Sequence, residues 1–136
     1  MTIDLSPFVN AVTRLEEGLD RYQQNTEDLQ IRDGLIQRFE FTYEIAHKML
    51  KRYLEFQSPT PGEFDEADFH YLIRTGNEKR LLLGDWEKWR GYRELRGKAN
   101  YACDEEVAVE VVEGIPAFLD EVRFLRDQLT TKAGPG

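Results

Sequence analysis

Cysteine and histidine are nearly absent from this sequence. Cys103 is the single cysteine, and His47 and His70 are the only histidines among 136 residues. One cysteine excludes an internal disulfide framework, and so few side chains of this kind do not favour a tetrahedral zinc site. We therefore expect neither a structural metal nor a cofactor.

Long apolar runs are also lacking. No segment approaches the roughly 18 consecutive apolar residues of a membrane span. The first ten residues, MTIDLSPFVN, have neither the basic start nor the apolar run of a secretory signal. Hydrophobic residues still make 40% of the chain and charged residues 32%, which is too apolar for disorder. We expect a cytoplasmic protein with one domain over residues 1–129 and a flexible tail over residues 130–136.

An excess of positive charge is missing as well. The formal net charge is −8, which argues against nonspecific binding to nucleic acid or to an anionic membrane, because phosphate neutralisation needs a basic surface. This balance does not exclude a local cationic cleft, and it suits pairing with a basic protein.

Strand patterns and generic catalytic motifs are absent, and helical periodicity takes their place. Nothing alternates with period two for long, and there is no solenoid repeat, glycine-rich phosphate loop, paired-cysteine zinc pattern or nucleophile elbow. The strongest helical pattern covers residues 31–55. Its predicted buried face consists of Leu35, Ile36, Phe39, Thr42, Tyr43, Ala46, Met49, Leu50, Tyr53 and Leu54.

The apolar arc of this helix is wider than one neighbour requires. Phe41, Ile45 and Phe56 extend the arc to roughly 220°, whereas a surface helix shows a stripe of little more than ~100°. Arg38 falls inside the arc, where a buried guanidinium needs an acceptor. An ion pair within the chain or at a subunit interface would supply one, and so would a phosphate or nucleotide. His47 points to the opposite, wet side.

Four further segments show helical spacing. Ser6 and Pro7 predict a helix start, and that helix ends near Asn25. Residues 57–63, QSPTPGE, form a loop before a short helix over residues 65–74 that Gly76 stops. Asp85 and Asp104 are predicted caps of two later helices, of which the last is bent near Gly114 and Pro116. The predicted fold is all-α, an antiparallel up-and-down four-helix bundle with a short extra helix.

Three stretches resemble a known family. They are RDGLIQRFEFTYEIAHKMLKRYLE from Arg32, IDLSPFVNAVTRLEEGL from Ile3, and DEEVAVEVVEGI from Asp104. The chain resembles the nucleotidyltransferase substrate-binding proteins, a branch of the HEPN helical bundles related to HepT toxins. The resemblance implies a homodimeric four-helix bundle whose partner is a small nucleotidyltransferase that carries the catalytic carboxylates. Many such pairs look like toxin–antitoxin modules in which the helical member is a ribonuclease that its partner silences by adenylylation.

The chain departs from the toxin branch at its reactive positions. That branch has an arginine, a histidine four to six residues later, and an acceptor tyrosine two residues further on. Arg96 matches the arginine, but Tyr101 replaces the histidine and Cys103 replaces the tyrosine. Cleavage of RNA needs a general base and acid near neutral pH, which imidazole supplies and a phenol of pKa about 10 does not. Tyr101 remains a candidate adenylyl acceptor.

The leading interpretation is a non-catalytic substrate-binding subunit that pairs with a separate nucleotidyltransferase. The alternatives are an endoribonuclease toxin with an altered motif and an interaction scaffold without a ligand. Trp86 and Trp89 are core residues or base-stacking residues. The residues predicted to bind a nucleotide, RNA or other substrate are Arg96, Lys98, Asn100, Tyr101, Arg38 and Arg32. Phe41 and Ile45 are predicted to lie in the dimer interface.

Overall fold

The computed structural model describes residues 3–65 and 68–133, which are all-helical and contain no strand. The fold class predicted from the sequence is confirmed. None of the helices within these ranges combines the length and the apolarity that a bilayer crossing requires. The elements are α1 (Ser6–Gln24), α2 (Leu29–Gln57), η1 (Pro61–Phe64), α3 (Phe69–Glu78), α4 (Trp86–Lys98), η2 (Ala99–Tyr101) and α5 (Glu105–Ala133).

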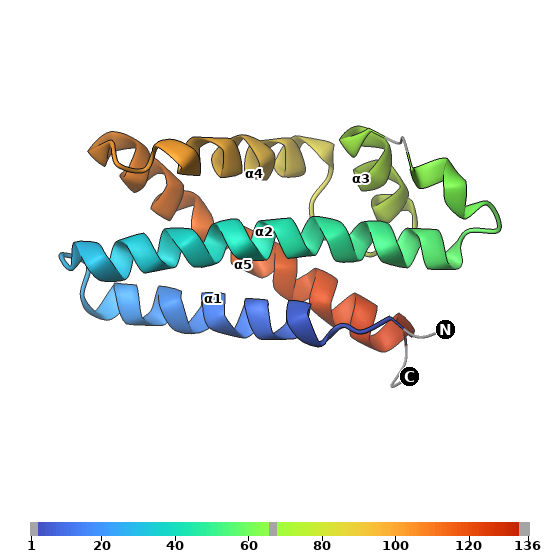
Figure 1. The fold of residues 1–136 in the computed structure, drawn as a ribbon, viewed down its shortest axis with the longest axis horizontal. Helices are drawn as coiled ribbons and strands as arrows, with labels where there is room; N and C mark the ends of the chain where they lie inside the picture. Colours follow the sequence, from blue (N-terminus) through green and yellow to red (C-terminus); the bar gives the residue numbers. More distant parts are fainter. Residues whose placement is uncertain (1–2, 66–67, 134–136) are drawn as a thin grey trace.

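Helix α2 lies at the centre of the bundle. In Figure 1, α1 runs antiparallel to α2 on one side, α4 and α3 follow one another along the other side, and α5 crosses behind. Helix α2 contacts each of the other four α-helices. This explains its wide apolar arc, and all ten residues of the predicted face are buried. Phe41 and Phe56 are about half exposed, so the arc is narrower than predicted at its edge.

Aspartate side chains begin four of the five α-helices. Asp28 starts α2 and Asp68 starts α3, and each carboxylate accepts a backbone N–H of the first turn. The predicted caps Asp85 and Asp104 are confirmed by their bonds to the backbone N–H groups of α4 and α5. The predicted Ser6 cap is wrong. Leu5 occupies that position without a side-chain bond to the first turn, and the carboxylate of Asp4 accepts the Ser6 backbone N–H at 3.0 Å.

Two predicted boundaries also differ from the structure. Helix α3 begins at Phe69 and continues past Gly76 to Glu78. A Cβ on Gly76 would lie 2.9 Å from Leu82 Cδ1, so this glycine leaves room for Leu82 and does not end the helix. Helix α5 continues to Ala133 and runs unbroken through Pro116, so residues 130–133 are not a tail. Residues 134–136, the rest of the predicted tail, lie outside the described residues, as do residues 66 and 67.

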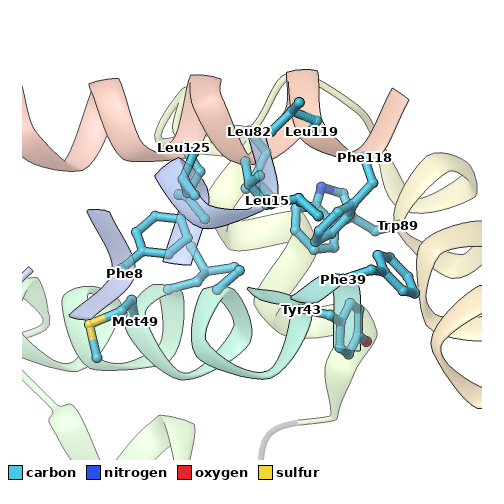
Figure 2. Packing of buried hydrophobic residues seen from close by; sticks show 14 of the residues in the cluster. Phe8, Leu15, Phe39, Tyr43, Met49, Leu82, Trp89, Phe118, Leu119 and Leu125 are labelled. Atoms are coloured by element: carbon cyan, nitrogen blue, oxygen red, sulfur yellow. The ribbon is translucent and has the colours of Figure 1, made fainter. Parts of the chain in front are cut away.

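Phe118 on α5 is the centre of an aromatic core. Its ring meets Phe39 edge-on at 5.0 Å and Tyr92 at 5.3 Å, and Trp89 lies 6.4 Å away. Figure 2 shows Phe118, Phe39, Tyr43 and Trp89 converging between α2, α4 and α5. Trp89 is 1% exposed, which assigns it to the core and not to base stacking. These edge-to-face pairs set the position of α4 against α2, and therefore the shape of the groove between them.

Candidate functional site

A groove of about 380 Å³ lies where α2, α3 and α4 meet. Helix α2 supplies one wall, α4 supplies the other, and Phe69 from the start of α3 closes one end. The buried core beneath fixes both walls, so the polar side chains above it stand on rigid elements. The lining residues are Tyr43, Glu44, His47, Phe69, Arg93, Arg96, Gly97 and Asn100.

Arg96 is the most constrained side chain of the groove. Its Nε donates to Glu44 Oε1 at 3.0 Å, its Nη1 lies 3.2 Å from Glu40 Oε2, and the same Nη1 donates to Asn100 Oδ1 at 3.1 Å. Only 23% of the Arg96 side chain is exposed, whereas 61% of the Glu44 side chain is exposed. The guanidinium is therefore held in place, and Glu44 is the partner that an incoming anion can displace most easily.

Arg93 stands one turn before Arg96 on α4. Its Cζ lies 5.4 Å above the ring of Phe69, within cation–π range, and it forms no ion pair with any described residue. Arg93 is not among the residues predicted from the sequence, although its i, i+3 spacing from Arg96 indicates a shared face. Arg93 adds to the groove a positive charge that no carboxylate of the described residues neutralises.

His47 also lines this groove, contrary to the prediction that it points to solvent. Its ring meets Phe69 edge-on at 5.1 Å and is only partly exposed. Burial lowers the pKa of His47 below its ordinary 6.5, and the nearby Lys51 and Arg93 lower it further against an opposing effect of Glu44. The imidazole is consequently neutral near neutral pH. The other histidine, His70, stacks on Trp86 at 4.4 Å.

The structure brings together only two of the predicted binding residues, Arg96 and Asn100. Lys98 lies on another side of α4 and pairs with Glu110 of α5 at 2.6 Å. Tyr101 is 71% exposed and lies outside the groove lining. Cys103 is exposed and borders a separate hollow that Asn100 also lines.

The two predicted binding arginines of α2 lie in different environments. Arg38 is exposed rather than buried, and its Nη1 donates to the backbone oxygen of Arg14 at 2.8 Å, so its acceptor is not an ion-pair partner. Arg32 is the buried arginine, 7% exposed, and forms two bonds of 2.8 Å to Glu105. This pair joins the starts of α2 and α5, and neither arginine lines the groove.

Phe41 and Ile45 lie on the outward side of α2. Phe41 is 55% exposed and Ile45 is half-buried. Both side chains line a shallow hollow of about 450 Å³. They are available to another molecule, and the predicted dimer interface stays a prediction.

Glu121 is a buried acid that sequence reasoning missed. It is 1% exposed, and its carboxylate accepts the backbone N–H groups of Leu83 and Gly84, each at 2.7 Å. Burial raises the pKa of Glu121, and the two backbone donors oppose that rise. A carboxylate between Phe118 and Val122, on the apolar face of a helix, was the available signal. Its role is to hold the loop that precedes α4.

The fold and the groove define the class of this protein, a small all-helical domain with an arginine-bearing groove between two helices. Residues 3–131 match the family described as nucleotidyltransferase substrate binding protein like, and the chain belongs to that family. The family resemblance noted in the sequence is therefore confirmed.

One similar solved structure is HI0074 from Haemophilus influenzae, described as the fold of a substrate binding domain of a nucleotidyltransferase. It has 30% sequence identity and a TM-score of 0.86, and the comparison covers 93% of this chain and 98% of that one. A similar curated protein is the "Probable ribonuclease HepT" of Haemophilus influenzae, 36% identical over 96 residues. That match covers 71% of this chain and 65% of the relative, slightly less than two thirds of its length.

Proposed function

We propose that this chain is a non-catalytic binding subunit that pairs with a separate minimal nucleotidyltransferase and holds an anionic group of that enzyme's substrate. Membership of the substrate-binding family supports the pairing. The groove between α2 and α4 supplies the binding site, and the transferase chemistry belongs to the partner. In this proposal the ligand is a nucleotide or another phosphate-bearing molecule.

The observation that carries the proposal is the pair of arginines on successive turns of α4. Arg93 has no carboxylate partner among the described residues, and Arg96 is already oriented by Glu40 and Asn100. A phosphate that replaces Glu44 at Arg96 also gains the charge of Arg93, which lines the same groove. Planar guanidiniums bind phosphate through two parallel N–H bonds, which favours this ligand class over a neutral one.

The test is binding of AMP, measured by isothermal titration calorimetry. Removal of the oriented charge in Arg96→Gln is expected to weaken AMP binding roughly tenfold or more. Glu44→Gln removes the competing carboxylate and is expected to tighten binding. Lys98→Gln is the matched control, because it removes an α4 cation that lies outside the groove. Equal AMP affinity of the native chain and Arg96→Gln would refute the proposed site.

The pairing is tested by co-expression with a minimal nucleotidyltransferase from the source organism. A stable complex in which transfer to substrate depends on Arg96 of this chain supports the proposal. Full transferase activity of the partner alone, with no gain when this chain is added, contradicts it.

A second candidate function is an endoribonuclease with an altered site. The name of the HepT relative raises this possibility, and His47 is the specific observation in its favour. The fold brings a neutral imidazole into the groove that holds Arg93 and Arg96, and such a group can act as a general base. RNA cleavage by the partner-free chain that is lost in both His47→Gln and Arg96→Gln would establish this function. Absence of cleavage contradicts the endoribonuclease function.

A further inference from the structure

The outward surface of α2 has two hollows on either side of Phe41. The first, about 450 Å³, is lined by Ile45, Lys48 and Lys51 among others. The second, about 390 Å³, lies between α1 and α2 and includes Arg14 and Arg38. Phe41 lines both hollows, so they form one continuous surface with an exposed aromatic ring at its centre. We call Arg14, Arg38, Phe41, Ile45, Lys48 and Lys51 the Phe41 face.

The cations of the Phe41 face lack the carboxylate partners that several other cations of the described residues have. Arg32, Arg96 and Lys98 each bind a glutamate from another helix. None of the four cations on the Phe41 face forms an ion pair with a described residue. The one acid that lines these hollows is Glu44, which shares Arg96 with Glu40, so the four cations of the Phe41 face outnumber the acid. A chain of net charge −8 thus presents a local surface of uncompensated positive charge.

This charge pattern disfavours a second copy of the same surface. A two-fold dimer uses the same patch on both subunits. Whether the two α2 helices run parallel or antiparallel, the cations at one end of each face meet cations of the other copy. Like charges opposed across an interface reduce affinity. The apolar centre formed by Phe41 and Ile45 favours a protein over a nucleic acid, since an aliphatic side chain gains little from a base or a phosphate.

We propose that the Phe41 face docks an acidic amphipathic helix of the partner nucleotidyltransferase. Apolar side chains of that helix pack against Phe41 and Ile45, and its carboxylates pair with the surrounding cations. This geometry is helix-in-groove recognition with complementary charge. The inference rests on the proposed function only in naming the nucleotidyltransferase as the protein that carries the helix.

The experiment measures binding of a fluorescent acidic helical peptide to the full chain by anisotropy. The peptide has about 18 residues, enough for a marginally stable helix, with leucine and glutamate at helical spacing. A matched peptide has glutamine in place of glutamate. The protein variants are Lys48→Glu with Lys51→Glu, and separately Phe41→Ser. The control variant, Arg74→Glu with Lys88→Glu, changes the net charge equally on exposed parts of α3 and α4.

The expected result is that the native chain binds the acidic peptide and loses roughly tenfold or more in affinity on charge reversal or on added salt. Phe41→Ser is expected to weaken binding similarly. The control variant should keep the native affinity for the acidic peptide, and the glutamine peptide should bind the native chain more weakly than the glutamate peptide. Circular dichroism verifies that all variants fold. With the natural pair, charge reversal is expected to dissociate the nucleotidyltransferase.

Three results would overturn the inference. One is equal peptide affinity for the native and charge-reversed chains. Another is preferential binding of single-stranded RNA to the same residues. A third is a native dimer, in sedimentation, that charge reversal or Phe41→Ser converts to monomer. AMP binding is measured in parallel, because its loss in Arg96→Gln concerns the groove and is independent of the Phe41 face.

Discussion

Replacing Glu121 should destabilise the protein by loosening the loop that precedes α4. Its carboxylate binds the consecutive N–H groups of Leu83 and Gly84 at 2.7 Å, and Asn77 binds the Gly84 carbonyl at 2.9 Å. A Cβ on Gly84 would lie 2.7 Å from Glu121 Oε1, so the loop closely surrounds the acid. Glu121→Ala leaves both N–H groups without their acceptor, and Glu121→Gln leaves one.

The magnitude follows from the number of lost bonds. A hydrogen bond to a charged group contributes about 1.5–3 kcal/mol, and the burial cost of the carboxylate offsets part of two such bonds. We expect Glu121→Ala to reduce the free energy of unfolding by about 3 kcal/mol, and Glu121→Gln by about half as much. Because small domains have about 5–15 kcal/mol in total, both variants should fold.

The pKa of Glu121 also predicts the sign of a pH effect. Burial raises the pKa of the folded-state carboxyl above the ordinary 4.5, so the folded state retains its proton after the unfolded chain has lost it. The stability contributed by this proton is present below pH 4.5 and is lost as pH rises through the folded-state pKa. The cost of Glu121→Gln relative to the native chain should therefore be smaller at neutral pH than below this window.

Urea denaturation followed by circular dichroism, at several pH values, measures these differences. Glu113→Ala is the control, because Glu113 is an exposed acid on the same helix that is in no ion pair with a described residue. Its effect should stay within about 0.5 kcal/mol. A loss below about 1 kcal/mol in Glu121→Ala would refute the role assigned to the two N–H bonds.

Three further predictions concern the core and two titrating groups. Phe118→Ala should cost about 3–5 kcal/mol of unfolding free energy in urea denaturation, because a fully buried ring and its aromatic contacts are lost; a cost near 1 kcal/mol would contradict its central position. Since burial lowers the pKa of His47, native stability should fall as pH falls through 6.5, the ordinary pKa of histidine, and His47→Phe should flatten the melting temperature over this range. An unchanged pH profile in His47→Phe would count against this role of His47. The bond to Arg32 lowers the pKa of Glu105 below 4.5, so Glu105→Gln should lower the melting temperature at neutral pH and lose its effect as pH falls through the folded-state pKa; an equal effect in acid would exclude this origin.

The sequence predicts the helices well because their signals are local. The ten-residue buried face of α2 follows from the 3.6-residue repeat of the helix, which can be read directly from the spacing of its apolar residues. Asp85 and Asp104 were predictable caps for the same reason, since a cap binds N–H groups only two or three residues away. The Ser6 error is a shift of one residue, since the helix begins at Ser6 and Leu5 precedes it as the cap.

The groove between α2 and α4 was only partly predictable. Arg96 and Asn100 are one helical turn apart, and that spacing is visible in the sequence. His47 and Phe69 join them from two other helices, through packing that no periodicity reports. Lys98 follows Arg96 closely in the sequence, yet the helix turns it towards Glu110 on a different side.

By itself the sequence determined the helical class, the central helix, the caps of the last two α-helices and the family to which the chain belongs. Only the tertiary structure decided which charges are paired. Arg32 is buried against Glu105 while Arg38 lies exposed on the Phe41 face, although both belong to the same helix. The physical reason is that helical period fixes which residues share a face, whereas the fate of a face depends on which distant helix covers it.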